Sequence, residues 1–175
     1  MTTATKFTMA RLALIPVFLI CMYLVSWNSG MQLAALFVFA IASLTDLIDG
    51  KIARKYNQVT DLGKFLDPLA DKVLVIAAMV MLCEWGIFPA WALMIVLARE
   101  FAVSGLRMIA ASKGSVIAAG WSGKVKTAAT MVCVVLMFLP IPAVVNTLCV
   151  WVITLTTLYS GVEYFMKNKD VIQSA

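Results

Sequence analysis

The stretch that decides the fold reads Asp46-Leu-Ile-Asp-Gly-Lys-Ile-Ala-Arg54 and, after eight further residues, Gly63-Lys-Phe-Leu-Asp-Pro-Leu-Ala-Asp71. These two segments hold four carboxylates in a chain that is 63% hydrophobic. Each carboxylate would cost about 2.5–3.5 kcal/mol at the centre of a membrane helix. No His or Cys accompanies them, and oxygen ligands alone suit a hard dication such as Mg²⁺, Mn²⁺ or Ca²⁺. The segments therefore predict a divalent-metal site.

The spacing of the carboxylates supports this interpretation. Asp46 and Asp49 are three residues apart, and Asp67 and Asp71 are four apart, so on helices each pair shares one face. Gly50 follows Asp46 by four residues, and its missing side chain leaves room on that face for a ligand. The alternative is an interhelical ion-pair network between these carboxylates and nearby Arg and Lys residues.

Composition predicts the fold class. The chain has 175 residues, of which only 13% are charged, and its mean hydropathy is +0.97. Such values are typical of an all-α polytopic membrane protein, and the length favours a single domain over residues 1–175. The apolar runs predict six transmembrane helices, at residues 12–27, 31–55, 67–84, 88–110, 127–139 and 143–166.

Polar stretches predict where these helices begin and end. We expect polar connections at residues 56–64 and 112–126 and a break at Pro140-Ile-Pro142. Asp67 stands directly before Pro68, which is a typical helix-start signal. A simple N-cap is therefore the alternative role for Asp67.

The distribution of basic residues predicts the orientation. The turns expected at residues 28–30, 85–89 and 140–142 carry no Lys or Arg, whereas nearly all Lys and Arg residues fall on the side of the N-terminus. The positive-inside rule then places both termini in the cytoplasm. The carboxylates come to lie at the cytoplasmic boundary of the bilayer, where a lipid headgroup meets water-soluble molecules.

The two segments match, without a gap, the pattern D-x2-D-G-x2-A-R-x8-G-x3-D-x3-D, and the chain thereby resembles the CDP-alcohol phosphatidyltransferases. This resemblance implies a membrane-embedded enzyme that requires Mg²⁺ or Mn²⁺. Such enzymes join an alcohol to the phosphatidyl group of a CDP-linked lipid and release CMP. The resemblance also implies a homodimer in the bacterial cytoplasmic (inner) membrane, with its active site facing the cytoplasm and no nucleic acid as a partner.

The resemblance assigns roles to individual residues. The metal ligands would be Asp46, Asp49, Asp67 and Asp71, and Asp71 would also be the general base that takes the proton of the attacking hydroxyl. The CDP-lipid would lie against Thr45, Gly50, Arg54, Gly63 and Arg11. The alternative role for Arg11 is that of a positively charged anchor, whose side chain extends to the membrane surface.

Polar residues in or next to the fourth and fifth predicted helices indicate which acceptor alcohol the protein uses. Arg99 and Glu100 are costly at mid-depth and should face the interior of the bundle. Together with Arg107 and Lys126, Arg99 could form a second phosphate site, which favours a phosphorylated alcohol. The alternative is that Arg99 and Glu100 form a structural ion pair, while lysines such as Lys124 only set the topology.

Longer matches refine the expected reaction. Three sequence segments resemble those of bacterial family members that use glycerol-3-phosphate: Ala98-Arg-Glu100, Ser104-Gly-Leu-Arg107 and Gly123-Lys-Val-Lys-Thr127. We therefore expect transfer of the phosphatidyl group of CDP-diacylglycerol to glycerol-3-phosphate. The alternatives are another acceptor, such as an inositol phosphate or phosphatidylglycerol, and a small cation transporter. The transporter is disfavoured because the carboxylates lie near one face and no inverted repeat is visible.

Overall fold

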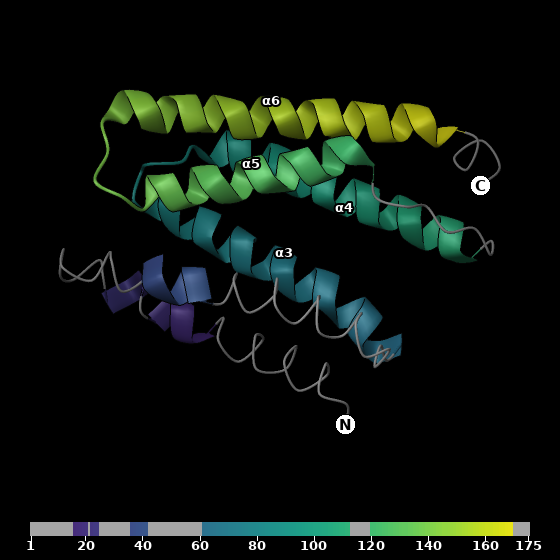
Figure 1. Cartoon of the computed structure of the whole chain (residues 1–175), viewed down its shortest axis with the longest axis horizontal. Coiled ribbons are helices and arrows are strands. Elements are labelled where there is room, and N and C mark those ends of the chain that lie inside the picture. Colours follow the sequence, from purple (N-terminus) through teal and green to yellow (C-terminus); the bar gives the residue numbers. More distant parts are fainter. Residues whose placement is uncertain (1–15, 21, 25–35, 42–60, 113–119, 170–175) are drawn as a thin grey trace. The chain divides into compact units, whose positions relative to one another are not determined.

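The computed structural model describes residues 16–20, 22–24, 36–41, 61–112 and 120–169, with the side chains of the third helix described from residue 72 onward. The described residues contain helices and turns but no strand. The four long helices are α3 (Asp61–Glu84), α4 (Ala90–Ser112), α5 (Trp121–Met137) and α6 (Ala143–Lys167) (Figure 1). The all-α expectation is therefore confirmed for this part of the chain, whereas the count of six helices stays a prediction.

The chain divides into two compact units, residues 1–81 and 82–175, and the division falls within α3. In the first unit, residues 16–20, 22–24 and 36–41 are helical. Phe18 and Phe39 are fully buried there, with ring centroids 5.8 Å apart. This spacing is within the range of favourable aromatic pairs.

Helix α3 begins at Asp61, six residues before the predicted start. The interpretation of Asp67 as an N-cap is therefore wrong, and residues 61–64 of the predicted polar connection belong to the helix. Pro68 lies inside the helix although a proline there removes one backbone hydrogen bond and costs about 3 kcal/mol. Strong helix formers, Leu, Ala and Lys among them, surround it, and the proline does not stop the helix. Asp67 and Asp71 consequently stand one turn apart on a continuous helix.

Helix α5 also begins six residues early, at Trp121 instead of Thr127. Its N-cap is Gly120, which has an extended backbone (φ −67°, ψ 161°). The prediction failed because Gly123, Lys124 and Lys126 looked like a polar connection. Within the helix, the side chain of Lys124 is exposed, while that of Lys126 is buried and forms an ion pair, described below.

The breaks between the later helices lie where the sequence predicts them. Helix α3 ends at Glu84, and the turn that follows contains Gly86 with φ +70°. The backbone N–H groups of Ile87 and Phe88 both donate to the carbonyl of Leu82, at 2.9 and 3.0 Å. Helices α5 and α6 are separated by residues 138–142, which include both prolines of the predicted break.

The second unit is built on α6, which packs against both α5 and α4 (Figure 1). Of the described helices, α6 alone is long and apolar enough to cross a membrane by length and composition. Large apolar side chains are exposed on the outer faces of these helices, among them Trp91, Met94, Phe101, Leu148, Leu155 and Val162. Charged and hydroxyl side chains are buried between them, namely Glu100, Lys126, Thr130, Thr154, Thr157 and Ser160. Apolar side chains on the outside, with the few buried charges held between helices, suit a lipid environment.

Gly86 offers a test of the turn after α3. Adding a Cβ there meets no atom within 4 Å, so Gly86→Ala should destabilise only through its left-handed backbone, by about 1–2 kcal/mol. Gly105→Ala is the matched control, because its added Cβ also meets open space but in the interior of α4, where alanine is favoured by roughly 0.5–1 kcal/mol. Thermal unfolding in detergent should show a lower midpoint for Gly86→Ala alone. Equal midpoints for both variants would contradict the assigned turn.

Candidate functional site

Most residues of the predicted metal and CDP-lipid sites lie outside the described part of the chain. This holds for Arg11, Thr45, Asp46, Asp49, Gly50 and Arg54. Gly63, Asp67 and Asp71 lie on α3, where the backbone is described but the side chains are not. Among the described side chains, no group of three or more His, Cys, Asp or Glu residues could hold a metal ion. The metal site therefore stays a prediction.

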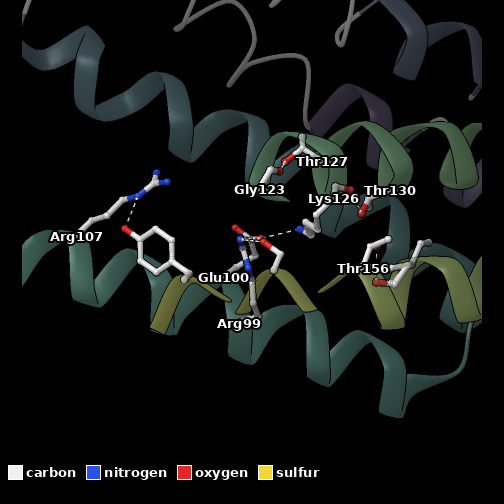
Figure 2. A network of polar contacts seen from close by, with 11 residues as sticks. Arg99, Glu100, Arg107, Gly123, Lys126, Thr127, Thr130 and Thr156 are labelled. Atoms are coloured by element: carbon white, nitrogen blue, oxygen red, sulfur yellow. Dashed lines mark hydrogen bonds and ion pairs between the residues drawn. The ribbon is translucent and has the colours of Figure 1, made fainter. Parts of the chain in front are cut away.

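The described residues do form one buried polar cluster, which joins α4, α5 and α6. Glu100 of α4 accepts two hydrogen bonds on the same oxygen, Oε1: from Arg99 Nη1 at 2.9 Å and from Lys126 Nζ of α5 at 2.6 Å. Arg99 Nη2 donates to Ser160 Oγ of α6 at 2.6 Å. Figure 2 shows Glu100 between the Arg99 and Lys126 side chains. We call Arg99, Glu100, Lys126 and Ser160 the polar cluster.

Helical spacing explains how this cluster becomes buried. Glu100 lies on the stripe that α4 buries, with Val96 one turn before it and Val103 one turn after it. Lys126 lies on the corresponding stripe of α5, one turn before Thr130. Both side chains are charged and nearly inaccessible, and buried charges persist only when they are paired and hydrogen-bonded. Among the described residues, two cations, Arg99 and Lys126, thus surround one carboxylate.

Two glycines make room for the Arg99 side chain. A Cβ added to Gly161 of α6 would lie 3.3 Å from Arg99 Cγ, and one added to Gly123 of α5 would lie 3.7 Å from Arg99 Nη2. The first distance is tight and the second is an ordinary contact. Gly161 therefore allows the guanidinium group to enter between the helices.

Arg107 is half-buried and lies on α4 eight residues, or about 12 Å, beyond Arg99. Its Nε donates to the hydroxyl of Tyr164 on α6 at 3.1 Å, and its guanidinium carbon lies 5.6 Å from the centroid of that ring. Figure 2 shows this side chain well separated from the polar cluster. Tyr164 is buried and packs with Val103 and Leu106 of α4.

The structure thus divides the residues predicted to bind the acceptor phosphate. It brings Arg99 and Lys126 together around Glu100, and it places Arg107 two turns away with a different partner. The predicted interior position of Arg99 and Glu100 is confirmed. Their predicted alternative as an ion pair is also observed, whereas the idea that lysines only set the topology fits exposed Lys124 but is wrong for buried Lys126.

The sequence interpretation missed the contribution of α6. Ser160 and Tyr164 both receive hydrogen bonds from arginines of α4. A signal was present: small and polar residues recur every three or four positions in an otherwise apolar run, at Thr154, Thr157, Ser160, Gly161 and Tyr164. That spacing is typical of one helix face.

Among the described side chains, three buried polar atoms have no hydrogen-bond partner: Arg99 Nε, Thr157 Oγ1 and, near the start of α6, Asn146 Oδ1. Thr130 and Thr154, in contrast, donate to carbonyls of their own helices, at 2.9 and 2.8 Å. The interior of the second unit therefore has unused donor capacity close to the polar cluster.

An open groove of about 400 Å³ lies elsewhere on α5 and α6. Its lining is mostly apolar and includes Trp121, Val125, Leu155 and Tyr159. None of the residues of the polar cluster lines it, and neither does Arg107.

Comparison with known proteins identifies the family. The family model described as CDP-alcohol phosphatidyltransferase matches residues 1–159. The chain belongs to the CDP-alcohol phosphatidyltransferase family. The matched range includes both carboxylate segments as well as Arg99, Arg107 and Lys126, so the predicted residues fall within the family's own region.

Several members of this family are similar over most of the chain. A CDP-diacylglycerol–glycerol-3-phosphate 3-phosphatidyltransferase of Bacillus subtilis (strain 168) is 43% identical over 187 aligned residues, which cover 97% of this chain and 96% of that protein. A protein of the same name from Escherichia coli (strain K12) is 45% identical over 136 residues, covering 73% of this chain and 71% of its own. A probable phosphatidylglycerophosphate synthase of Mycobacterium tuberculosis (strain ATCC 25618 / H37Rv) is 37% identical over 165 residues, covering 92% and 78%.

The polar cluster predicts a large effect of Glu100→Gln on stability. The change leaves Arg99 and Lys126 buried without their carboxylate, which should cost about 3–5 kcal/mol. Thermal unfolding in detergent should show the loss. When Glu100→Gln is combined with Lys126→Met, the total loss of stability should be smaller than the sum of the two separate losses, because neighbouring residues of one network couple.

Glu163→Gln is the matched control for this test. Glu163 also pairs with a lysine, Lys167, but one turn away on α6 and with that lysine largely exposed. We expect little change in its unfolding midpoint. A Glu100→Gln variant as stable as this control would show that the cluster does not hold α4 and α5 together.

Proposed function

We propose that this protein transfers the phosphatidyl group of CDP-diacylglycerol to glycerol-3-phosphate, yielding phosphatidylglycerophosphate and CMP. The observation that carries the proposal is the 43% identity to the Bacillus subtilis enzyme of that name along almost the full length of both chains. Two further relatives, from Escherichia coli and Mycobacterium tuberculosis, bear names of the same reaction or product. The cations of α4 and α5 that are buried or half-buried, Arg99, Arg107 and Lys126, support a phosphorylated acceptor.

The carboxylates are suited to hold a divalent metal, Mg²⁺ or Mn²⁺. Asp67 and Asp71 stand one turn apart on α3, and Asp46 and Asp49 complete an all-oxygen donor set of the kind that hard dications prefer. When bound, such an ion neutralises charge on the pyrophosphate and its leaving group. We assign these four aspartates as its ligands.

The chemistry of the chain's own residues follows from this arrangement. The acceptor hydroxyl oxygen forms a bond to the phosphorus that carries the diacylglycerol, while the bond from that phosphorus to the CMP oxygen breaks. Asp71 takes the proton of the hydroxyl as general base. Thr45, Gly50, Arg54, Gly63 and Arg11 hold the CDP-lipid, and Arg99, Arg107 and Lys126 attract the phosphate of the acceptor.

The setting for this reaction is a membrane. We propose a single domain of six transmembrane helices with both termini in the cytoplasm, working as a homodimer in the bacterial cytoplasmic membrane. The apolar outer faces of α4 and α6 and the length of α6 support the membrane setting. The clustering of Lys and Arg on one side of the predicted spans supports the orientation.

The proposal is tested by product identification. Purified protein is incubated with CDP-diacylglycerol and Mg²⁺ or Mn²⁺, and glycerol-3-phosphate, glycerol, an inositol phosphate and phosphatidylglycerol are offered separately. Lipid products are identified by mass spectrometry. We expect phosphatidylglycerophosphate from glycerol-3-phosphate, no product with glycerol, and loss of activity on chelation that Mg²⁺ or Mn²⁺ reverses. Preference for another alcohol, or full activity after chelation, would overturn the acceptor or the metal respectively.

Asp71→Asn tests the proposed base. The amide cannot take the proton, so CMP release should fall by about 10²–10⁴-fold. Asp61→Asn is the matched control, because it makes the same change on the same helix at a position outside the carboxylate pattern. Near-normal turnover of Asp71→Asn would remove Asp71 as the base, whereas equal losses in both variants would point to damage of α3.

A further inference from the structure

We propose that Tyr164 is a positioning residue that orients Arg107 to bind the phosphate of the acceptor alcohol, and so contributes to the selection of a phosphorylated substrate. The inference rests on the proposed function, since it concerns the same acceptor. It extends that function to α6, a helix to which neither the carboxylate pattern nor the predicted phosphate site assigns a residue.

The geometry fixes the Arg107 guanidinium in two ways. The Tyr164 hydroxyl accepts a hydrogen bond from Nε at 3.1 Å, and the tyrosine ring lies 5.6 Å from the guanidinium carbon, within the range of a cation–π contact. Tyr164 itself is 7% exposed and packs with Val103, Leu106 and Phe165. A ring held in this way presents its hydroxyl from one direction only, so the arginine is anchored at Nε (Figure 2).

Anchoring at Nε leaves the other end of the guanidinium group for a ligand. Nε carries one of the five N–H donors, and the four others belong to the two terminal nitrogens. Among the described residues, none accepts a hydrogen bond from either terminal nitrogen of Arg107, and no carboxylate forms an ion pair with it. Two parallel N–H groups at a fixed end match two oxygens of a phosphate.

Arg99 shows the contrasting arrangement on the same helix. One of its terminal nitrogens donates to Glu100 and the other to Ser160, and its Nε is the buried atom without a partner. Its terminal nitrogens are thus occupied by protein groups and its charge is shared with a carboxylate. Arg107 is therefore the arginine of α4 that is prepared for an external anion, and Arg99 mainly holds the helices together.

The test compares steady-state kinetics of the full-length protein and its Tyr164→Phe variant in detergent micelles with Mg²⁺. Phenylalanine keeps the ring and the packing but removes the hydroxyl. We expect the KM for glycerol-3-phosphate to rise about three- to tenfold, the effect of losing one hydrogen bond. The KM for CDP-diacylglycerol, kcat and the unfolding midpoint should not change. Tyr159→Phe, the same substitution at an exposed position of α6, should leave all four quantities unchanged.

A double-mutant cycle shows whether Tyr164 acts through Arg107. Lysine has no Nε–H to donate to Tyr164 and no paired terminal donors, so Arg107→Lys should raise the same KM. Adding Tyr164→Phe to Arg107→Lys should then have no further effect. Additive effects of the two substitutions, or an equal rise in both KM values, would overturn the positioning role.

The outcomes also separate this inference from the proposed function. If the unmodified protein makes phosphatidylglycerophosphate and Tyr164→Phe behaves like Tyr159→Phe, the function stands and the role of Tyr164 is refuted. If the unmodified protein uses an unphosphorylated alcohol instead, the proposed function fails, and the role of Tyr164 in phosphate selection fails with it. A lower unfolding midpoint for Tyr164→Phe together with a lower kcat would reassign the tyrosine to packing alone.

Discussion

The ion pairs of Glu100 are the interaction on which the second unit depends. A single carboxylate oxygen receives hydrogen bonds from Arg99 beside it and from Lys126 on α5, and Arg99 continues the connection to Ser160 on α6. In surroundings formed largely by apolar side chains, none of these charges is stable alone. The need to pair them therefore constrains how α4, α5 and α6 lie against one another. The nearby glycines of α5 and α6 fit this role, because they leave space for the long arginine side chain.

One face of α4 has two roles along its length. Around Glu100, the charged groups form ion pairs with one another. Two turns further on, Arg107 is held by Tyr164, through its Nε and through the face of the tyrosine ring. Helix α6 provides the partner in both places, through Ser160 and Tyr164. The ion pairs of Glu100, which align the helices, thus lie two turns from Arg107, whose terminal donors have no partner among the described residues. Precise recognition of an anion requires that the arginine be held rigidly in this way.

This arrangement suits membership of the CDP-alcohol phosphatidyltransferase family. A reaction between a lipid and a phosphorylated alcohol needs an apolar exterior for the bilayer and a positive interior for phosphate groups. The described helices have both, with large apolar side chains outside and the charged residues inside. In the proposed reaction, cations that lie between helices would attract the phosphate of the acceptor with less screening than surface charges would.

Much of the fold could be predicted from the sequence, because the signals are local. The left-handed Gly86 and the two prolines after Phe138 end helices through their own backbone preferences. Pro68 and Gly123 misled the prediction for the opposite reason: a local breaking tendency was outweighed by the helix on both sides. The carboxylate pattern of the predicted metal site is likewise a property of spacing along the chain, and the family that it indicated is confirmed by the family model that matches residues 1–159.

The tertiary structure decided which polar residues meet. Lys126 pairs with a residue 26 positions away, and the partners of Arg99 and Arg107 on α6 lie 61 and 57 positions away. Helical spacing indicates which face a residue occupies, but not which neighbouring helix covers that face or at what height. The sequence therefore predicted that Arg99 and Glu100 face the interior, and it grouped Arg107 with Arg99 and Lys126 without placing it. Only helix packing decided that Arg99 is occupied by Glu100 and Ser160, while Arg107 is held at Nε by Tyr164 and its terminal nitrogens have no partner among the described residues.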